Sequence, residues 1–292
     1  MKRIFKLTDL FKPKHCLFGV CDNIALNFNK IKVWAFSFQK VCKDKDVCLI
    51  CLDATDEEIE MCRSIGIKAF KSELDKDSYG DVNHKRLKPA RDFIESSSYK
   101  YFLVTDVFDV LFQQDPFEKL DFDSYDVFAG KEGILVNEEP WNFDNIKKLF
   151  PDKIESCVGH PVVCSGIIAG KKEALIPVYE KMFDMCQNES TDDHAIKDQA
   201  AFIVMISNDQ IPKLKLFDLN EGWAVHCAVA GPTNLFEGWG FKGKILESGL
   251  ALPQLKSGKI KTGEELFDIV HQFNRIPEWE ESLIGEYINE QT

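Results

Sequence analysis

Strand patterns and helical patterns alternate through the first 106 residues, and this alternation constrains the fold more than any other feature. Apolar runs typical of strands lie at residues 16–21, 46–52, 67–71 and 99–106, with helical patterns between them at residues 30–42, 55–66 and 83–97. Strands and helices in this rhythm pair in parallel through right-handed crossovers. We therefore predict an α/β fold with a central, mostly parallel sheet flanked by helices on both faces.

The predicted helix at residues 55–66 carries start and stop signals. Thr55 stands at the N-cap position, Glu58 follows at the capping-box position, and Gly66 favours the end of the helix. After residue 117 the pattern is less regular, with helices expected at residues 171–187, 192–208 and 263–270. Because no linker or repeat interrupts the chain, we expect one domain over residues 1–292.

The charge of the chain limits the partners it can have. With 292 residues and 45% hydrophobic residues it can fill a sizeable core, and its formal net charge is −12. Such a surface repels nucleic acid and anionic membranes. We expect no nucleic-acid partner, and a bound polyanion would need a local pocket.

The cysteines and the apolar stretches indicate a cytoplasmic protein or one at the cytosolic face of a membrane. The ten cysteines are scattered and not spaced as in disulfide frameworks or zinc sites. Cys48 and Cys51 form a C-x-x-C, but strand alternation would turn them to opposite faces. No stretch approaches the roughly 20 apolar residues of a transmembrane helix, and the N-terminus does not match a signal peptide.

Asp106 and Asp109 lie directly behind the buried strand pattern "YKYFLVTD". In open α/β sheets ligands bind beyond the carboxyl ends of the strands. Two neighbouring carboxylates at that place suit a hard divalent cation, Mn²⁺ or Mg²⁺. The alternative is structural: Asp106 would cap a turn and Asp109 would be solvated.

The segment "FLVTDVFDVLFQQDPF" resembles the D-x-D-type motif of nucleotide-sugar-dependent glycosyltransferases with the GT-A fold, here as D-x-x-D. Further likenesses follow in the family's order. "GVCDN" and "WAFSF" resemble the nucleotide-binding half, "VVCSGIIAGKKEAL" the strand with a Ser-Gly, "KDQAAF" the Asp-Gln helix start, and "IVHQFNRIPEW" the late segment with a His seen in glycogenin-like enzymes. The resemblance implies a GT-A-like domain whose nucleotide half spans about residues 14–117 and whose acceptor half and C-terminal lid span residues 118–292.

The resemblance also implies roles for single residues. Asp106, Asp109 and His271 would hold the metal, and Asp198 would contact the sugar or act as a general base, with Asp192 and Asp193 as alternatives that more simply cap a helix. The nucleotide or its phosphates would be bound by Asn23, Arg86, Arg91, Asp106, Lys242 and Arg275. Trp141, Trp223 and Trp239 are candidates to stack on a sugar ring or to pack in the core. "GWGFKG", residues 238–243, would form a loop that closes over the donor.

These features favour a metal-dependent transferase that moves a sugar from a nucleotide diphosphate donor, a UDP-sugar, to a hydroxyl of a glycan, protein or lipid-linked acceptor. Two alternatives stay open. A nucleotidyltransferase also places acids at strand ends, but the chain lacks an early Gly-rich basic loop. A non-catalytic nucleotide-sugar-binding protein would keep the fold and lack turnover.

Overall fold

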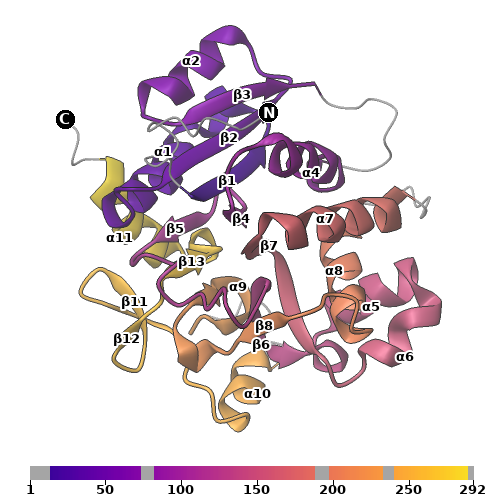
Figure 1. Cartoon of the computed structure of the whole chain (residues 1–292). Helices are drawn as coiled ribbons and strands as arrows, with labels where there is room; N and C mark the ends of the chain where they lie inside the picture. The colour runs from indigo at the N-terminus through magenta and orange to yellow at the C-terminus, as the bar shows by residue number, and fades with distance from the viewer. Residues whose placement is uncertain (1–13, 74–81, 188–196, 233–239, 289–292) are drawn as a thin grey trace.

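The computed structural model describes residues 14–73, 82–187, 197–232 and 240–288, and it has a layered α/β architecture (Figure 1). Its centre is a seven-stranded sheet with the order β3-β2-β1-β4-β7-β6-β8. The strands are β1 (His15–Cys21), β2 (Asp46–Leu52), β3 (Lys68–Ser72), β4 (Tyr101–Thr105), β6 (Val127–Leu135), β7 (Pro161–Lys171) and β8 (Leu214–Phe217). β7 runs antiparallel to both β4 and β6, while the other neighbouring pairs are parallel. The prediction of a mostly parallel sheet is confirmed.

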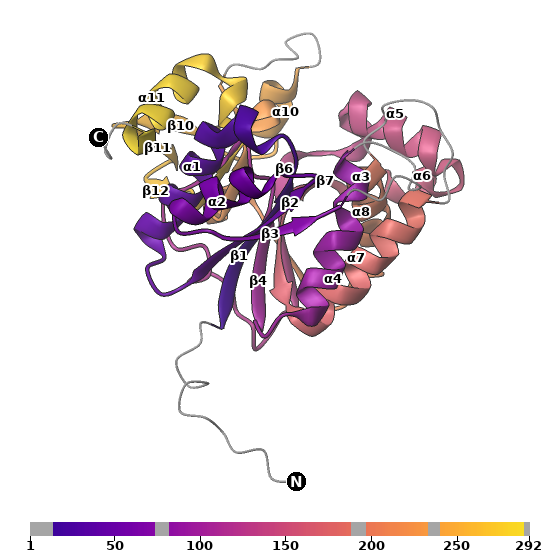
Figure 2. The same ribbon diagram turned by 90° about the horizontal axis from the view of Figure 1, so that it is seen from above.

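Helices cover both faces of this sheet (Figure 2). The longer ones are α1 (Ile24–Val41), α2 (Asp56–Ser64), α4 (Leu87–Ser96), α5 (Pro140–Leu149), α7 (Lys172–Gln187), α8 (Lys197–Ser207), α10 (Phe241–Glu247) and α11 (Pro277–Ile288), and the short ones are α3 (Val82–Lys85), α6 (Ile154–Cys157) and α9 (Cys227–Ala230). Helices α1 and α2 share one core layer with the sheet, and α4, α7 and α8 share the other. No helix in the described ranges is long and apolar enough to cross a bilayer.

The local features predicted from the sequence are present in the structure. Thr55 Oγ1 accepts from the Glu58 N–H at 3.2 Å and Glu58 Oε2 accepts from the Thr55 N–H at 2.8 Å, which is the predicted capping box. Gly66 follows the helix with φ +82°, a conformation that favours glycine. Cys48 and Cys51 lie in different core layers, and all ten cysteines are buried and outside any disulfide. The structural interpretation of the C-x-x-C is therefore confirmed.

The C-terminal part adds two small sheets, and here one prediction is wrong. Residues 263–270, predicted as a helix, form β12 (Glu265–Leu266) and the first residues of β13 (Ile269–His271). β13 pairs with β5 (Val110–Phe112) on one side and with β9 (Ala224–His226) on the other, and β10 (Gln254–Lys256), β11 (Lys259–Thr262) and β12 form the third sheet. Burial of β13 between two distant strands outweighs a weak local preference for helix.

Candidate active site

The two acids predicted to form a site flank a short loop at the carboxyl end of β4. Asp106 follows the last residue of β4 and Asp109 precedes the first residue of β5. The Trp34 indole N–H donates to Thr105 Oγ1 at 2.8 Å, and the Asp106 N–H donates to the Gly166 carbonyl at 2.8 Å. These bonds attach the end of β4 to α1 and to β7, so the loop has a fixed position beyond the sheet edge.

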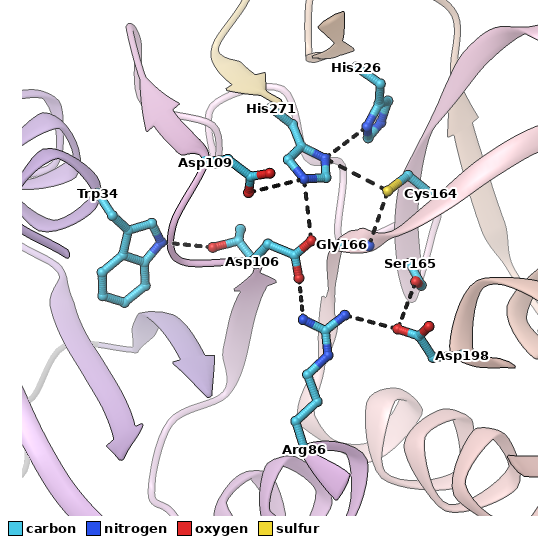
Figure 3. Close-up of polar contacts among 11 residues, drawn as sticks. Trp34, Arg86, Asp106, Asp109, Cys164, Ser165, Gly166, Asp198, His226 and His271 are labelled. Atoms are coloured by element: carbon cyan, nitrogen blue, oxygen red, sulfur yellow. Dashed lines mark hydrogen bonds and ion pairs between the residues drawn. The ribbon is translucent and has the colours of Figure 1, made fainter. Parts of the chain in front are cut away.

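His271, the last residue of β13, faces both acids (Figure 3). Its Nε2 lies 3.3 Å from Asp106 Oδ2 and 3.4 Å from Asp109 Oδ1. The Gln272 N–H donates to the Asp109 carbonyl at 2.8 Å, which joins the end of β13 to the acid loop. Both carboxylates therefore converge on one imidazole, and the alternative of a capped turn with a solvated Asp109 does not describe this loop.

This triad has the chemistry and spacing of a divalent-cation site. The ligand atoms of Asp106, Asp109 and His271 all lie within 4.8 Å of one another. His271 Nε2 is buried and has no hydrogen-bond partner of good geometry among the described residues. Adjacent ligands of an octahedral ion with bonds of about 2.1 Å are about 3 Å apart, close to the separations seen here. Two carboxylate oxygens and an imidazole thus fit Mn²⁺ or Mg²⁺.

Gly166 on β7 makes room for the triad. A Cβ at this position would lie 2.8 Å from His271 Cε1 and closer still to Asp106 Oδ2. Any larger residue would separate the two side chains. Glycine at position 166 is therefore required for the packing of the site.

Arg86 connects the acid loop to α8. Its Nη1 pairs with Asp106 Oδ1, and its Nη2 donates to Asp198 Oδ2 at 2.9 Å. Asp198, in the first turn of α8, also accepts from Ser165 Oγ at 3.1 Å. The side chain of Asp198 is 1% exposed, and its Oδ1 has no partner among the described residues. This oxygen can accept a hydrogen bond from a bound ligand.

Charge balance in the site overrides the effect of burial. Burial alone would raise the pKa of Asp106, but the Arg86 guanidinium and His271 hold that pKa well below its usual range. Burial would lower the pKa of His271, but Asp109, Cys164 and Asp106 raise it well above its ordinary value. In this structure His271 supplies positive charge between Asp106 and Asp109, and Arg86 supplies it between Asp106 and Asp198.

The other edge of the His271 ring faces a cysteine and a second histidine (Figure 3). His271 Nδ1 lies 3.0 Å from His226 Nδ1 and 3.7 Å from Cys164 Sγ. His226 is the register partner of His271 across β9 and β13. Burial and the charge of His271 lower the pKa of His226 well below its ordinary value, so its ring is neutral.

A cavity of about 350 Å³ opens over these residues. Glu132 of β6 also lines this cavity and is 5% exposed. Burial and then the charge of Glu139 raise the pKa of Glu132 to about 8. Glu132 is therefore protonated at neutral pH and presents a hydrogen-bond donor to the cavity.

Hydrogen bonds hold the remaining wall in place. Glu139 accepts from the backbone N–H groups of Trp141 and Asn142 and caps α5, while the Asn142 side chain donates to Glu139 and accepts from Gln199 of α8 at 2.9 Å. Trp141 lines the cavity and is 39% exposed. The wall thus combines a fixed polar row with an accessible aromatic ring.

The structure brings six of the nine predicted site residues to this cavity, namely Arg86, Asp106, Asp109, Asp198, His271 and Arg275. The other three, Asn23, Arg91 and Lys242, are not among its lining residues. Asn23 is exposed before α1, Arg91 pairs with Asp92 at 2.7 Å, and Lys242 is exposed on α10.

Of the three candidate tryptophans, the structure brings one to the cavity. Trp141 lines the cavity, whereas Trp223 is buried in the core and donates to the Pro116 carbonyl at 3.0 Å. Trp239, Asp192 and Asp193 lie outside the described residues, as does residue 238. The rest of "GWGFKG" was predicted as a loop, but residues 241–243 form the first turn of α10 after Gly240, so that prediction is wrong for them.

Sequence reasoning missed Glu132, Cys164, His226 and Gln199. Gln199 and Cys164 stand inside quoted motifs and could have been noticed there. Glu132 sits in "AGKEGIL", where a lone acid between apolar residues of a strand is a detectable sign of a buried carboxyl. His226 had no such signal, since only the pairing of β9 with β13 brings it to the site.

Solved glycosyltransferases share this fold. An active-site mutant of LgtC aligns with a TM-score of 0.58 at 10% identity, over 95% of this chain and 96% of the LgtC chain. The galactosyltransferase LgtC in complex with donor and acceptor sugar analogues gives 0.55 at 10% identity, over 94% and 96%. GlyE from Streptococcus pneumoniae TIGR4 gives 0.54 at 12% identity, over 95% of this chain and 64% of GlyE.

No protein-family model and no curated protein matches the sequence. The structural likeness at these low identities shows the fold, and the predicted GT-A-like fold is confirmed.

Proposed function

We propose that this protein is a metal-dependent glycosyltransferase that moves a sugar from a nucleotide diphosphate donor, a UDP-sugar, to a hydroxyl of an acceptor. One observation carries the proposal. Asp106, Asp109 and His271 converge at the carboxyl end of β4, on the wall of a cavity, in a fold shared with glycosyltransferases. The acceptor is a glycan, a protein or a lipid-linked saccharide.

The metal explains how an acidic protein could bind this donor. The chain has a net charge of −12, and the cavity is itself rich in carboxylates, so a diphosphate would be repelled without a cation. Bound Mn²⁺ or Mg²⁺ would neutralise the diphosphate and stabilise the charge that develops on it as the sugar departs. Arg86 and Arg275, which line the same cavity, are placed to add positive charge from the protein.

Asp198 is the residue that we assign to the sugar. Arg86 and Ser165 fix one of its carboxylate oxygens, and the other is buried without a partner among the described residues. An unpaired buried carboxylate oxygen loses the hydrogen bonds that it had in water, so a sugar hydroxyl that donates to it would bind favourably. The same oxygen could accept the proton of an acceptor hydroxyl.

The acceptor half of the chain, residues 118–292 in this proposal, supplies the rest of the sugar site. Trp141 offers a flat apolar face to a sugar ring, and Glu132 can donate from its protonated carboxyl to a ring hydroxyl. The bonds from Gln199 through Asn142 to Glu139 keep this wall rigid. A rigid wall reduces the entropy lost when a sugar binds.

A thermal-shift panel of nucleotides and nucleotide sugars tests donor binding. A ligand that binds only the folded state raises the Tm by mass action. We expect UDP or a UDP-sugar to raise the Tm with Mn²⁺ and not with EDTA, and Asp109→Asn to abolish the increase. Asp152→Asn, an exposed acid on the surface, is the matched control and should behave like the wild type.

Three outcomes of the panel have different meanings. Metal-dependent stabilisation by a UDP-sugar that Asp109→Asn removes supports the proposal. The same stabilisation in a protein that shows no sugar transfer or hydrolysis in a separate assay of UDP release would instead favour a non-catalytic binding protein. If no nucleotide diphosphate shifts the Tm under any metal condition, the assignment of the acid loop is wrong.

A further inference from the structure

We propose that Cys164, His226 and His271 form a second metal site, selective for a soft or borderline ion of the Zn²⁺ class, back to back with the acid triad and sharing His271 with it. The two sites use opposite edges of one imidazole ring (Figure 3). This proposal concerns metal binding alone and does not depend on glycosyl transfer.

The two ligand separations that involve His271 are close to those of a tetrahedral site, and the atoms of Cys164 and His226 lie within 4.8 Å of each other. His226 Nδ1 lies 3.0 Å from His271 Nδ1, and Cys164 Sγ lies 3.7 Å from the same nitrogen. Bonds of about 2.3 Å to sulfur and about 2.05 Å to nitrogen place tetrahedral ligands about 3.6 Å apart for S and N and about 3.3 Å apart for two N atoms. The observed separations lie within a few tenths of an ångström of these values.

The three ligands come from separate strands, and the fold fixes their convergence. Cys164 is in β7, His226 ends β9 and His271 ends β13. The parallel register of β9 and β13 sets the two histidines side by side, and all three residues are at most 4% exposed. A thiolate with two imidazoles prefers Zn²⁺ and similar ions over Mg²⁺ or Mn²⁺, which prefer oxygen ligands.

Groups around the cluster of Cys164, His226 and His271 support metal binding there. The Gly166 N–H points at Cys164 Sγ at 3.3 Å, which favours the thiolate that a metal needs. With His271 bound to a metal through Nδ1, its Nε2–H would point at the carboxylates of Asp106 and Asp109. A carboxylate behind a metal-bound histidine is the usual outer-shell arrangement at zinc sites.

The cavity provides access and an open coordination position. Cys164 and His271 both line it, so an ion can reach them from solvent. Three protein ligands leave the fourth position of a tetrahedral ion for water or another small ligand. Binding displaces the proton of the Cys164 thiol and the proton on Nδ1 of the charged His271 ring, and both pass to solvent as the metal bonds form.

Sharing His271 makes the two sites exclusive. A neutral imidazole has one nitrogen lone pair, so a metal on Nδ1 places the ring proton on Nε2, the atom that the acid triad needs. Two dications a few ångströms apart would also repel each other. A Zn²⁺-class ion in the cysteine site therefore displaces Mn²⁺ from the acid site, and, if the proposed function holds, inhibits the enzyme.

Cobalt titration of the reduced full chain tests the site directly. We expect one Co²⁺ to bind with a thiolate-to-metal charge-transfer band and intense tetrahedral d–d bands, both removed by stoichiometric Zn²⁺. Cys164→Ser should lose the charge-transfer band. Its affinity for Co²⁺ should fall by more than the roughly 10- to 100-fold that follows loss of an outer-shell partner, because a direct ligand is removed. The matched control is Cys227→Ser, a buried cysteine next to His226 that is not in the cluster, and it should keep the band.

Two further measurements cover variants that fail to fold and the claim of exclusivity. X-ray absorption of the zinc-loaded wild type should show one sulfur and two histidine nitrogens in the first shell. Electron paramagnetic resonance should show that Zn²⁺ releases bound Mn²⁺ from the wild type and not from Cys164→Ser. The site would be overturned by a wild type with no thiolate band, by a band that persists in Cys164→Ser, or by a first shell without sulfur. Simultaneous binding of Zn²⁺ and Mn²⁺ would overturn the claim that the two sites are exclusive.

Discussion

At Gly166 a single added carbon would occupy the space in which Asp106 and His271 meet. The position shows how one residue of β7 controls a site whose ligands all belong to other elements. Its neighbours Cys164 and Ser165 point into the same cavity. Within this short stretch, Cys164 lies at the Nδ1 edge of the His271 ring and Gly166 makes room for the contact of the ring with Asp106.

Gly166→Ala should abolish metal-dependent nucleotide stabilisation. The new Cβ would push Asp106 away from His271, and overpacking of this kind lowers the free energy of unfolding by roughly 1–3 kcal/mol. Gly243→Ala is the control, because nothing lies within 4 Å of a Cβ there and the helix α10 should gain up to about 1 kcal/mol. Thermal shifts with and without Mn²⁺ and UDP measure both effects. A Gly166→Ala protein that binds like the wild type would contradict the geometry of the triad.

Glu132→Gln should stabilise the protein increasingly as the pH rises. The folded-state pKa of about 8 lies above the unfolded value near 4.5, so the folded chain keeps a proton that the unfolded chain loses. The stability that this proton contributes is complete below about pH 4.5 and is lost as the pH rises to about 8. Glutamine does not titrate and has no such loss. At pH 7 the resulting difference in the free energy of unfolding between Glu132→Gln and the wild type is on the order of 3 kcal/mol.

Urea unfolding at pH 5, 6, 7 and 8 measures this difference between Glu132→Gln and the wild type. The gain should grow through the series, while Glu155→Gln, an exposed control on α6, should show little change with pH. Equal gains at all four values would mean that Glu132 is ionised in the folded protein. If Glu132→Gln stabilises the protein and also slows sugar transfer to the acceptor, Glu132 serves function at a cost in stability.

At the scale of elements, the sequence correctly predicted the features that depend on local patterns. The alternation of strands and helices, the capping box of α2 and the opposite faces of Cys48 and Cys51 depend on neighbours along the chain, and the structure confirms them. Residues 263–270 were wrongly predicted because β13 takes its conformation from strands far away in the sequence. The same pairing brought His226 to the site, and for that reason no local pattern indicated it.

The cap of α2 should matter for stability and not for the site. Thr55→Ala removes one half of the capping box, which lowers the free energy of unfolding by about 1 kcal/mol. Glu58 also accepts from the Ala25 N–H at 3.0 Å, so part of the link between α1 and α2 remains. Denaturant unfolding should show the loss, and the increase in Tm produced by Mn²⁺ and UDP should equal that of the wild type. A variant that no longer responds to the ligand would show that α2 is coupled to the cavity.

At the scale of the molecule, the site is assembled from both halves of the chain. The resemblance of short motifs predicted the fold and selected six residues that the cavity brings together, although each motif alone is degenerate. Asn23, Arg91 and Lys242 were selected by type and by order in the sequence, and neither property fixes the direction of a long or exposed side chain. Glu132 was not selected because its role depends on burial beside Glu139, which only the folded chain creates.

The acidic character of the whole chain gives the central claim its most direct test. With a net charge of −12, turnover of a nucleotide diphosphate donor should require the cation that Asp106, Asp109 and His271 are proposed to hold. The measurement is release of UDP from a panel of UDP-sugars, with Mn²⁺ or with EDTA, by the wild type, Asp109→Asn and Asp152→Asn. We predict turnover of at least one donor with Mn²⁺, none with EDTA, and loss in Asp109→Asn but not in Asp152→Asn. Turnover that persists in EDTA or in Asp109→Asn would contradict the account.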